Sequence, residues 1–150
     1  MTKTINISYC HCSLDELAAA DRQLVEAAFK ATRQAYAPFS GFRVGAAARL
    51  RSGEIITAAN CESEVFPSGL CAERSLLHYY ATNYATDPIE ALAIASDPSE
   101  RECYPCGACR QVILDAERRQ QSPIRIIMAG GGTATTVESA ESLLPFTFRL

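Results

Sequence analysis

The sequence has few positive charges. Its 150 residues contain only two lysines, Lys3 and Lys30, among 14 basic side chains, and the formal net charge is −3. A protein that binds nucleic acid more often carries a basic patch of Lys and Arg on one face. The acidic residues are spread along the chain and are not gathered in a tail. We therefore expect no nucleic-acid partner.

Long apolar runs are also missing. Residues 1–6 lack the apolar core of a signal peptide, and no segment approaches the length of a membrane span. These absences favour a cytoplasmic protein with no membrane partner. No repeat, low-complexity tract or linker divides the chain, and the contents of hydrophobic (48%) and charged (21%) residues are ordinary for a globular protein. We expect residues 1–150 to form a single domain with a buried core.

The cysteines are the most informative residues. Seven is an odd number in a chain without an export signal, so metal binding or free thiols are a better interpretation than a disulfide framework. In Cys10-His11-Cys12, three adjacent donors cannot readily converge on one ion, and we interpret this segment as structural.

Three other cysteines have the spacing of a catalytic zinc site. Cys71 is followed by Glu73, and further along Cys106 and Cys109 follow Pro105 in a P-C-x-x-C pattern. Three protein ligands leave a zinc ion one open position for water, as in a catalytic site, and zinc deaminases have this layout. We predict one zinc ion per chain on the three cysteines, with Glu73 as the proton shuttle, acting first as base and then as acid.

The zinc-binding segments are predicted to start two helices. Cys106 and Cys109 are three residues apart and share one face of a first turn, while Cys71 begins another helix. Helix N-termini carry partial positive charge, which favours thiolates. Either Arg74 or Arg110 is expected to lie against the sulfurs and support them. We favour Arg74, because it is three residues beyond Cys71 and shares its face.

A different metal site remains an alternative. Cys103, Cys106 and Cys109 are evenly spaced, and with Cys71 they would form a closed Cys₄ zinc site or hold an iron–sulfur cluster. Such a chain would be a non-catalytic binding module. Two observations weigh against this alternative. Pro105 places Cys103 before the helix, and a Cys₄ site leaves Glu73 without a role.

Periodicity predicts the fold class. A helix is predicted from the capping box of Ser13 and Glu16 to Pro38. Alternating or continuous apolar residues predict five strands, at 42–50, 55–60, 89–96, 124–129 and 133–137. Helices starting near Cys71 and at Pro105 separate the central strands. The prediction is an α/β domain of three layers, a mixed five-stranded sheet with helices on both faces.

Several segments resemble the small-chain cytidine deaminases, the homotetrameric type within the zinc-dependent cytidine and deoxycytidylate deaminase family. Residues 37–47, APFSGFRVGAA, are similar to the family pattern A-P-Y-S-x-F-x-V-G-A-A, and residues 59–62 to its G-x-N-x-E. Residues 71–74, CAER, and 105–111, PCGACRQ, match directly. The resemblance covers nearly the whole chain.

The resemblance implies a hydrolase of pyrimidine salvage that converts cytidine and deoxycytidine to uridine and deoxyuridine and releases ammonia. It implies that Phe42 packs on the pyrimidine ring and that Asn60 and Glu62 hydrogen-bond the ribose hydroxyls. It also implies that the backbones of Ala72 and Tyr104 contact the base.

Family members of this size form homotetramers in which a C-terminal aromatic residue reaches a neighbour's active site. Residues 143–148 resemble that segment, and we assign the aromatic to Phe148. Packing of Phe148 within its own subunit is the competing interpretation.

Some positions depart from the family pattern. They are Ala59, Ser63, Glu64, Phe66 and Tyr104. All are expected to border the sugar or the amine, so they bear on the substrate and not on the reaction. The alternative substrate is another aminated pyrimidine nucleoside, such as an aminonucleoside antibiotic, whose cationic group Glu64 would select.

Overall fold

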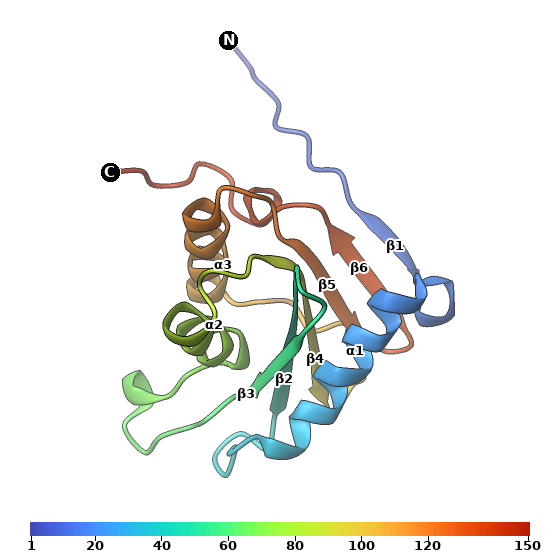
Figure 1. Cartoon of the computed structure of the whole chain (residues 1–150), viewed down its shortest axis with the longest axis vertical. Coiled ribbons are helices and arrows are strands. Elements are labelled where there is room, and N and C mark those ends of the chain that lie inside the picture. Colours follow the sequence, from blue (N-terminus) through green and yellow to red (C-terminus); the bar gives the residue numbers. More distant parts are fainter.

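In the computed structural model, which describes residues 1–150, a mixed sheet of six strands forms the middle layer (Figure 1). The strands are β1 (Cys10–Ser13), β2 (Arg43–Leu50), β3 (Ile55–Ala59), β4 (Ile89–Asp97), β5 (Arg125–Gly130) and β6 (Thr133–Val137). Their order across the sheet is β1-β6-β5-β4-β2-β3, and only β4 and β5 pair in parallel.

The expected mixed sheet is confirmed, but the expected number of five strands is wrong. The sixth strand is β1, which pairs antiparallel with β6 at one edge. Its four residues include no buried side chain. A short, exposed edge strand has no apolar alternation, so periodicity could not reveal it.

Helices cover both faces of the sheet, as expected. Helix α1 (Ala19–Ala31) lies on one face, and α2 (Ala72–Asn83) and α3 (Gly107–Gln120) lie on the other (Figure 1). Strand β4 contributes to both cores: Ala91 and Ala93 pack under α1, whereas Leu92 and Ile94 pack under α2 and α3. The small residues on the α1 side let that helix lie close to the sheet.

The first helix is shorter than predicted. The backbone N–H of Ser13 donates to Oε2 of Glu16 at 2.8 Å, so the capping interaction forms. It starts only the 3₁₀ turn η1 (Leu14–Glu16), and α1 begins later. Three further 3₁₀ turns are present: η2 (Thr32–Gln34), η3 (Phe66–Ser68) and η4 (Ala140–Leu143).

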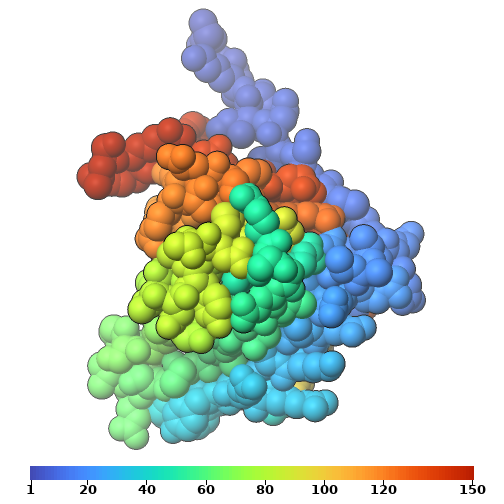
Figure 2. All heavy atoms as spheres, viewed as in Figure 1, coloured from blue at the N-terminus to red at the C-terminus, as the bar shows by residue number.

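Both ends of the chain extend away from the layered body (Figure 2). The N-terminal arm exposes Ile5, Ile7 and Tyr9, and the C-terminal tail exposes Phe146 and Phe148. No helix combines the length and the hydropathy needed to cross a membrane.

Candidate metal centre and active site

The N-termini of α2 and α3 meet at three cysteines. Cys71 and Cys106 are the N-cap residues of the two helices, and Cys109 lies in the first turn of α3. The Sγ atom of Cys106 is 3.9 Å from that of Cys71 and 3.4 Å from that of Cys109, and all three lie within 4.8 Å of one another. Tetrahedral zinc–sulfur bonds of about 2.3 Å place sulfurs about 3.8 Å apart, so the donors present fit zinc.

Arg74 lies on the next turn of α2 from Cys71. Its Nη2 atom donates to the Sγ atom of Cys71 at 3.8 Å. The pKa of Cys71 is lowered to about 5 by hydrogen bonds, first from Cys109 and then from Arg74 and Cys106. The pKa of Cys109 is raised, first by its hydrogen bond to Cys71 and then by burial. The structure thus places Arg74 against the sulfur of Cys71, whereas Arg110 donates to the carbonyls of Pro105 and Leu143.

Glu73 is buried beside these thiols. It lies in the first turn of α2 and is 3% exposed. Burial raises the pKa of its carboxyl to about 7, and the nearby negative charge of Cys71 acts in the same direction. A carboxyl with a pKa near neutrality can both accept and return a proton, which is the property required of a proton shuttle.

Cys103 is not part of the donor group. The three cysteines are the only set of three or more donors close enough to hold one ion. Cys103 is 8% exposed, and burial raises the pKa of its thiol to about 11. This arrangement does not support the Cys₄ alternative. Cys10, His11 and Cys12 form no metal cluster either.

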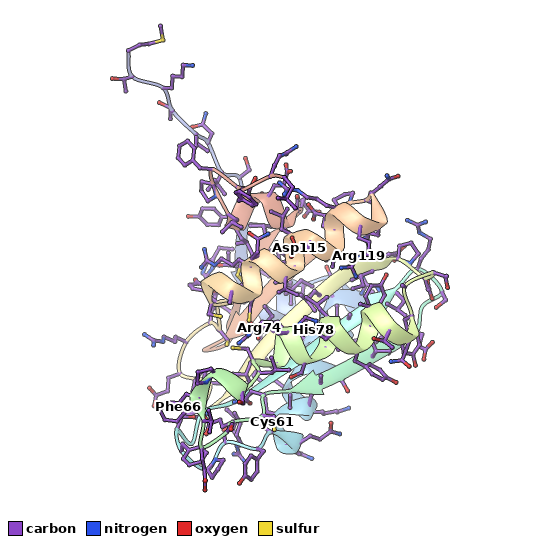
Figure 3. The ribbon with its side chains drawn as sticks, turned by 90° about the vertical axis from the view of Figure 1, so that its left-hand side faces the viewer. Cys61, Phe66, Arg74, His78, Asp115 and Arg119 are labelled. Carbon is purple, nitrogen blue, oxygen red and sulfur yellow. The ribbon has the colours of Figure 1, made fainter.

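An open hollow of about 250 Å³ lies beside Cys71. Its lining includes Asn60, Glu62, Ser63, Phe66, Cys71 and Arg74. Figure 3 shows Cys61 and Phe66 on the segment that leads into α2, with Arg74 and then His78 along that helix. Two predicted sugar-binding residues therefore share a cavity with one of the cysteines.

Asn60 joins the end of β3 to the start of β2. Its Oδ1 atom accepts from the backbone N–H of Val44 at 2.8 Å, and its Nδ2 atom donates to the carbonyl of Phe42 at 2.9 Å. One amide proton and one lone pair are left for a ligand. Asn60 thus fixes the backbone of Phe42, whose ring is exposed.

Glu62 holds the loop that precedes β2. Its Oε1 atom accepts from the backbone N–H groups of Phe39 and Ser40, at 2.9 and 3.1 Å, and its Oε2 atom accepts from the hydroxyl of Ser40 at 2.5 Å. These bonds, that of the Ser40 hydroxyl first, lower the pKa of Glu62. The rings of Phe39 and Phe66 meet edge to face, with centroids 6.1 Å apart.

Three other residues were predicted to contact the substrate, and they differ in how far they are buried. Ala72 is fully buried at the start of α2, next to Cys71. Tyr104 is 56% exposed, and its hydroxyl donates to Glu102, a residue that no motif marked. Phe148 is not packed in its own subunit: it is 73% exposed, and its carbonyl accepts from Arg118 on the C-terminal part of α3.

Known proteins share both the sequence pattern and the fold. Residues 18–122 match the family described as the cytidine and deoxycytidylate deaminase zinc-binding region. The chain belongs to this family. A cytidine deaminase of Halalkalibacterium halodurans is 40% identical to it over 96 residues, which are 63% of this chain and 71% of that protein. The crystal structure of cytidine deaminase from Burkholderia pseudomallei has a TM-score of 0.71 and 34% identity, covering 84% of this chain and 97% of that one.

A blasticidin-S deaminase is also similar to this chain. The protein from Bacillus cereus is 31% identical over 134 residues, covering 85% of this chain and 91% of that protein. Its identity to this chain is lower than that of the Halalkalibacterium cytidine deaminase. The comparison therefore does not favour the aminonucleoside alternative.

Proposed function

We propose that this chain is a zinc-dependent hydrolase that converts cytidine and deoxycytidine to uridine and deoxyuridine, with one ammonia released and one water consumed. The observation that carries the proposal is the buried carboxyl of Glu73 beside three convergent thiols in a member of this family. We assign one zinc ion per chain to Cys71, Cys106 and Cys109.

The chemistry divides between the metal and Glu73. Zinc, when bound, supplies the Lewis acidity that makes water a nucleophile near neutral pH. Glu73, the buried carboxyl beside the three thiols, accepts a proton of the attacking water. The same carboxyl delivers this proton to the ring nitrogen and then carries the second proton of that water to the departing amine, which leaves as ammonia. Arg74 donates to the sulfur of Cys71 and offsets its negative charge.

The nucleoside is bound by the segments on either side of these residues. The pyrimidine packs on the exposed ring of Phe42, with backbone contacts from Ala72 and Tyr104. The ribose hydroxyls use the remaining hydrogen-bonding capacity of Asn60 and Glu62. One flat apolar wall with a few fixed polar groups is what a nucleoside site requires.

A cytoplasmic homotetramer in pyrimidine salvage is part of the proposal, with residues 1–150 acting as a single domain. In it, Phe148 reaches a neighbour's site. Its exposure in one subunit supports this role. Phe148→Ala should raise the KM for cytidine, while Phe146→Ala, which changes a still more exposed ring in the same tail, should not. Sedimentation of both variants would report the oligomer, and equal KM values would remove Phe148 from the site.

The deciding experiment follows the ultraviolet absorbance of cytidine with zinc-loaded protein. Deoxycytidine, blasticidin S and the free base cytosine serve as further substrates, and zinc content is measured in parallel. We expect turnover of cytidine, and its loss in Glu73→Gln with zinc retained. Glu64→Gln is the matched control and should stay active on cytidine.

Each other outcome changes one part of the proposal. Turnover of blasticidin S alone would assign the aminonucleoside as substrate, and Glu64→Gln should then lower that activity. Bound zinc without turnover of any substrate would indicate a non-catalytic module. Retained activity in Glu73→Gln would remove its role as proton shuttle. A loss of zinc in Cys103→Ser would revive the four-cysteine site.

A further inference from the structure

A buried carboxylate lies four residues before Cys106, at the start of the segment that leads into α3. The side chain of Glu102 is 6% exposed, and its two oxygens have different partners. Oε1 accepts from the hydroxyl of Thr133 on β6 at 2.6 Å and lies 3.2 Å from Nδ1 of His11 on β1. Oε2 accepts from the hydroxyl of Tyr104 at 2.8 Å. One carboxylate therefore connects two strands to the segment that carries a cysteine of the metal centre.

The rest of this segment is held through its backbone. The N–H of Cys103 donates to the carbonyl of Ala129 on β5 at 3.2 Å, and Nε of Arg110 donates to the carbonyl of Pro105 at 2.9 Å. Tyr104 lies between these two anchors and belongs to no helix or strand. Because its ring is more than half exposed, packing does not restrict it, and the hydrogen bond to Glu102 sets its direction.

We propose that Glu102 is a positioning residue for the reaction: by holding the hydroxyl of Tyr104, it fixes the segment from Tyr104 to Cys106, which leads into the metal centre. The proposal rests on the proposed function, in which Tyr104 contacts the base. A hydrogen bond to a largely buried carboxylate is stronger than one between neutral groups, so it can fix an otherwise exposed side chain. His11 extends the arrangement to β1, so the N-terminal strand supports the site without contacting the substrate.

A double-mutant cycle tests this role. Glu102→Gln and Tyr104→Phe are made alone and together, and KM, kcat and zinc content are measured with cytidine. Tyr104→Phe should raise KM about tenfold, roughly the value of one hydrogen bond to a charged group, and Glu102→Gln should raise it by a smaller factor, with kcat and zinc content unchanged in both. The double variant should be no worse than Tyr104→Phe alone, because that change removes the hydrogen bond that Glu102→Gln only weakens by removing the charge.

Tyr9→Phe is the matched control. Tyr9 lines the same cavity of about 280 Å³ as Tyr104, but its hydroxyl has no hydrogen bond to Glu102. Its KM should equal that of the wild type. If Glu102→Gln does not fold, the KM of Tyr104→Phe compared with that of Tyr9→Phe still shows whether the hydrogen bond to Glu102 affects substrate binding.

Two results would overturn the positioning role: an unchanged KM in Tyr104→Phe, or single effects that multiply in the double variant. A merely structural role of Glu102 would lower zinc content and thermal stability and leave Tyr104→Phe without effect. Absence of cytidine turnover in the wild type would instead remove the proposed function, which keeps the two failures distinct.

Discussion

The guanidinium of Arg74 lies 3.8 Å from the sulfur of Cys71, one turn further along the same helix. The contact follows from helix geometry, because residues three apart share a face. It places a positive charge beside three sulfurs that carry negative charge when they bind a metal. Two helix N-termini point at the same sulfurs, so backbone dipoles and one cation together stabilise the thiolates.

Replacing Arg74 should weaken the metal centre. We expect Arg74→Gln to bind zinc about 10- to 100-fold more weakly than the wild type, as is typical when a partner of a metal ligand is removed. Competition with a chromogenic chelator measures the affinity. Arg119→Gln is the control, since Arg119 is exposed on the last turn of α3, away from Arg74 (Figure 3). Equal zinc affinity in the two variants would contradict a role for Arg74 at the sulfurs.

Removing the metal should expose a difference in reactivity between two cysteines. The pKa of Cys71 is lowered to about 5, so in zinc-free protein its thiolate is present above that pH and disappears below it. The pKa of Cys103 is raised to about 11 by burial, so its thiol stays protonated at neutral pH.

Iodoacetamide near neutral pH should therefore label Cys71 and leave Cys103 unmodified, because the thiolate is the nucleophile. Peptide mass mapping at a series of pH values measures both residues in one sample. Zinc-loaded protein is the control, in which Cys71 should be protected. Labelling of Cys71 that rises only above pH 9, the ordinary range of a thiol, would contradict the lowered pKa.

The parts of this molecule that follow local rules could be predicted from sequence. Alternation in β2 and a continuous apolar run in β4 predicted these strands, and the cysteine spacing predicted that Cys71, Cys106 and Cys109 share one metal ion. Strand β1 could not be predicted, because its pairing with β6 joins residues more than a hundred positions apart without an apolar pattern. Glu102 was missed for a related reason: its partners His11, Tyr104 and Thr133 come from separate segments, and a single carboxylate has no spacing to recognise.

Asn60 should affect stability and substrate binding together. Asn60→Ala leaves the N–H of Val44 and the carbonyl of Phe42 without partners, which should cost about 1–3 kcal/mol of unfolding free energy. The KM for cytidine should also rise, because the change removes both the proposed sugar contact of Asn60 and its hydrogen bond to the backbone of Phe42. Urea unfolding and steady-state kinetics measure the two effects.

Asn83→Ala is the matched control for Asn60. The amide of Asn83 also donates to a backbone carbonyl, that of Tyr79 at 2.9 Å, but at the exposed end of α2. The KM of Asn83→Ala for cytidine should remain at the wild-type value. A loss of stability in Asn60→Ala with unchanged KM would limit Asn60 to a structural role.

The close approach of α1 to the sheet should make Gly45 intolerant of a side chain. A Cβ atom at Gly45 would overlap the carbonyl oxygen of Ala28 and lie 2.9 Å from the backbone nitrogen of Thr32. Helix backbone cannot move as a flexible side chain does, so α1 would have to shift. We expect Gly45→Ala to lower the free energy of unfolding by about 1–3 kcal/mol, the usual cost of overpacking.

Gly107→Ala is the control, because it should not lower the free energy of unfolding. A Cβ atom there would meet no atom within 4 Å, and the residue lies in the first turn of α3. Alanine is favoured over glycine in a helix, so Gly107→Ala should leave stability unchanged or raise it by up to about 1 kcal/mol. Urea unfolding of the two zinc-loaded variants gives the comparison. Equal stability would show that α1 can move away from β2 at little cost, and the tight packing of alanines beneath α1 would then not restrain the helix.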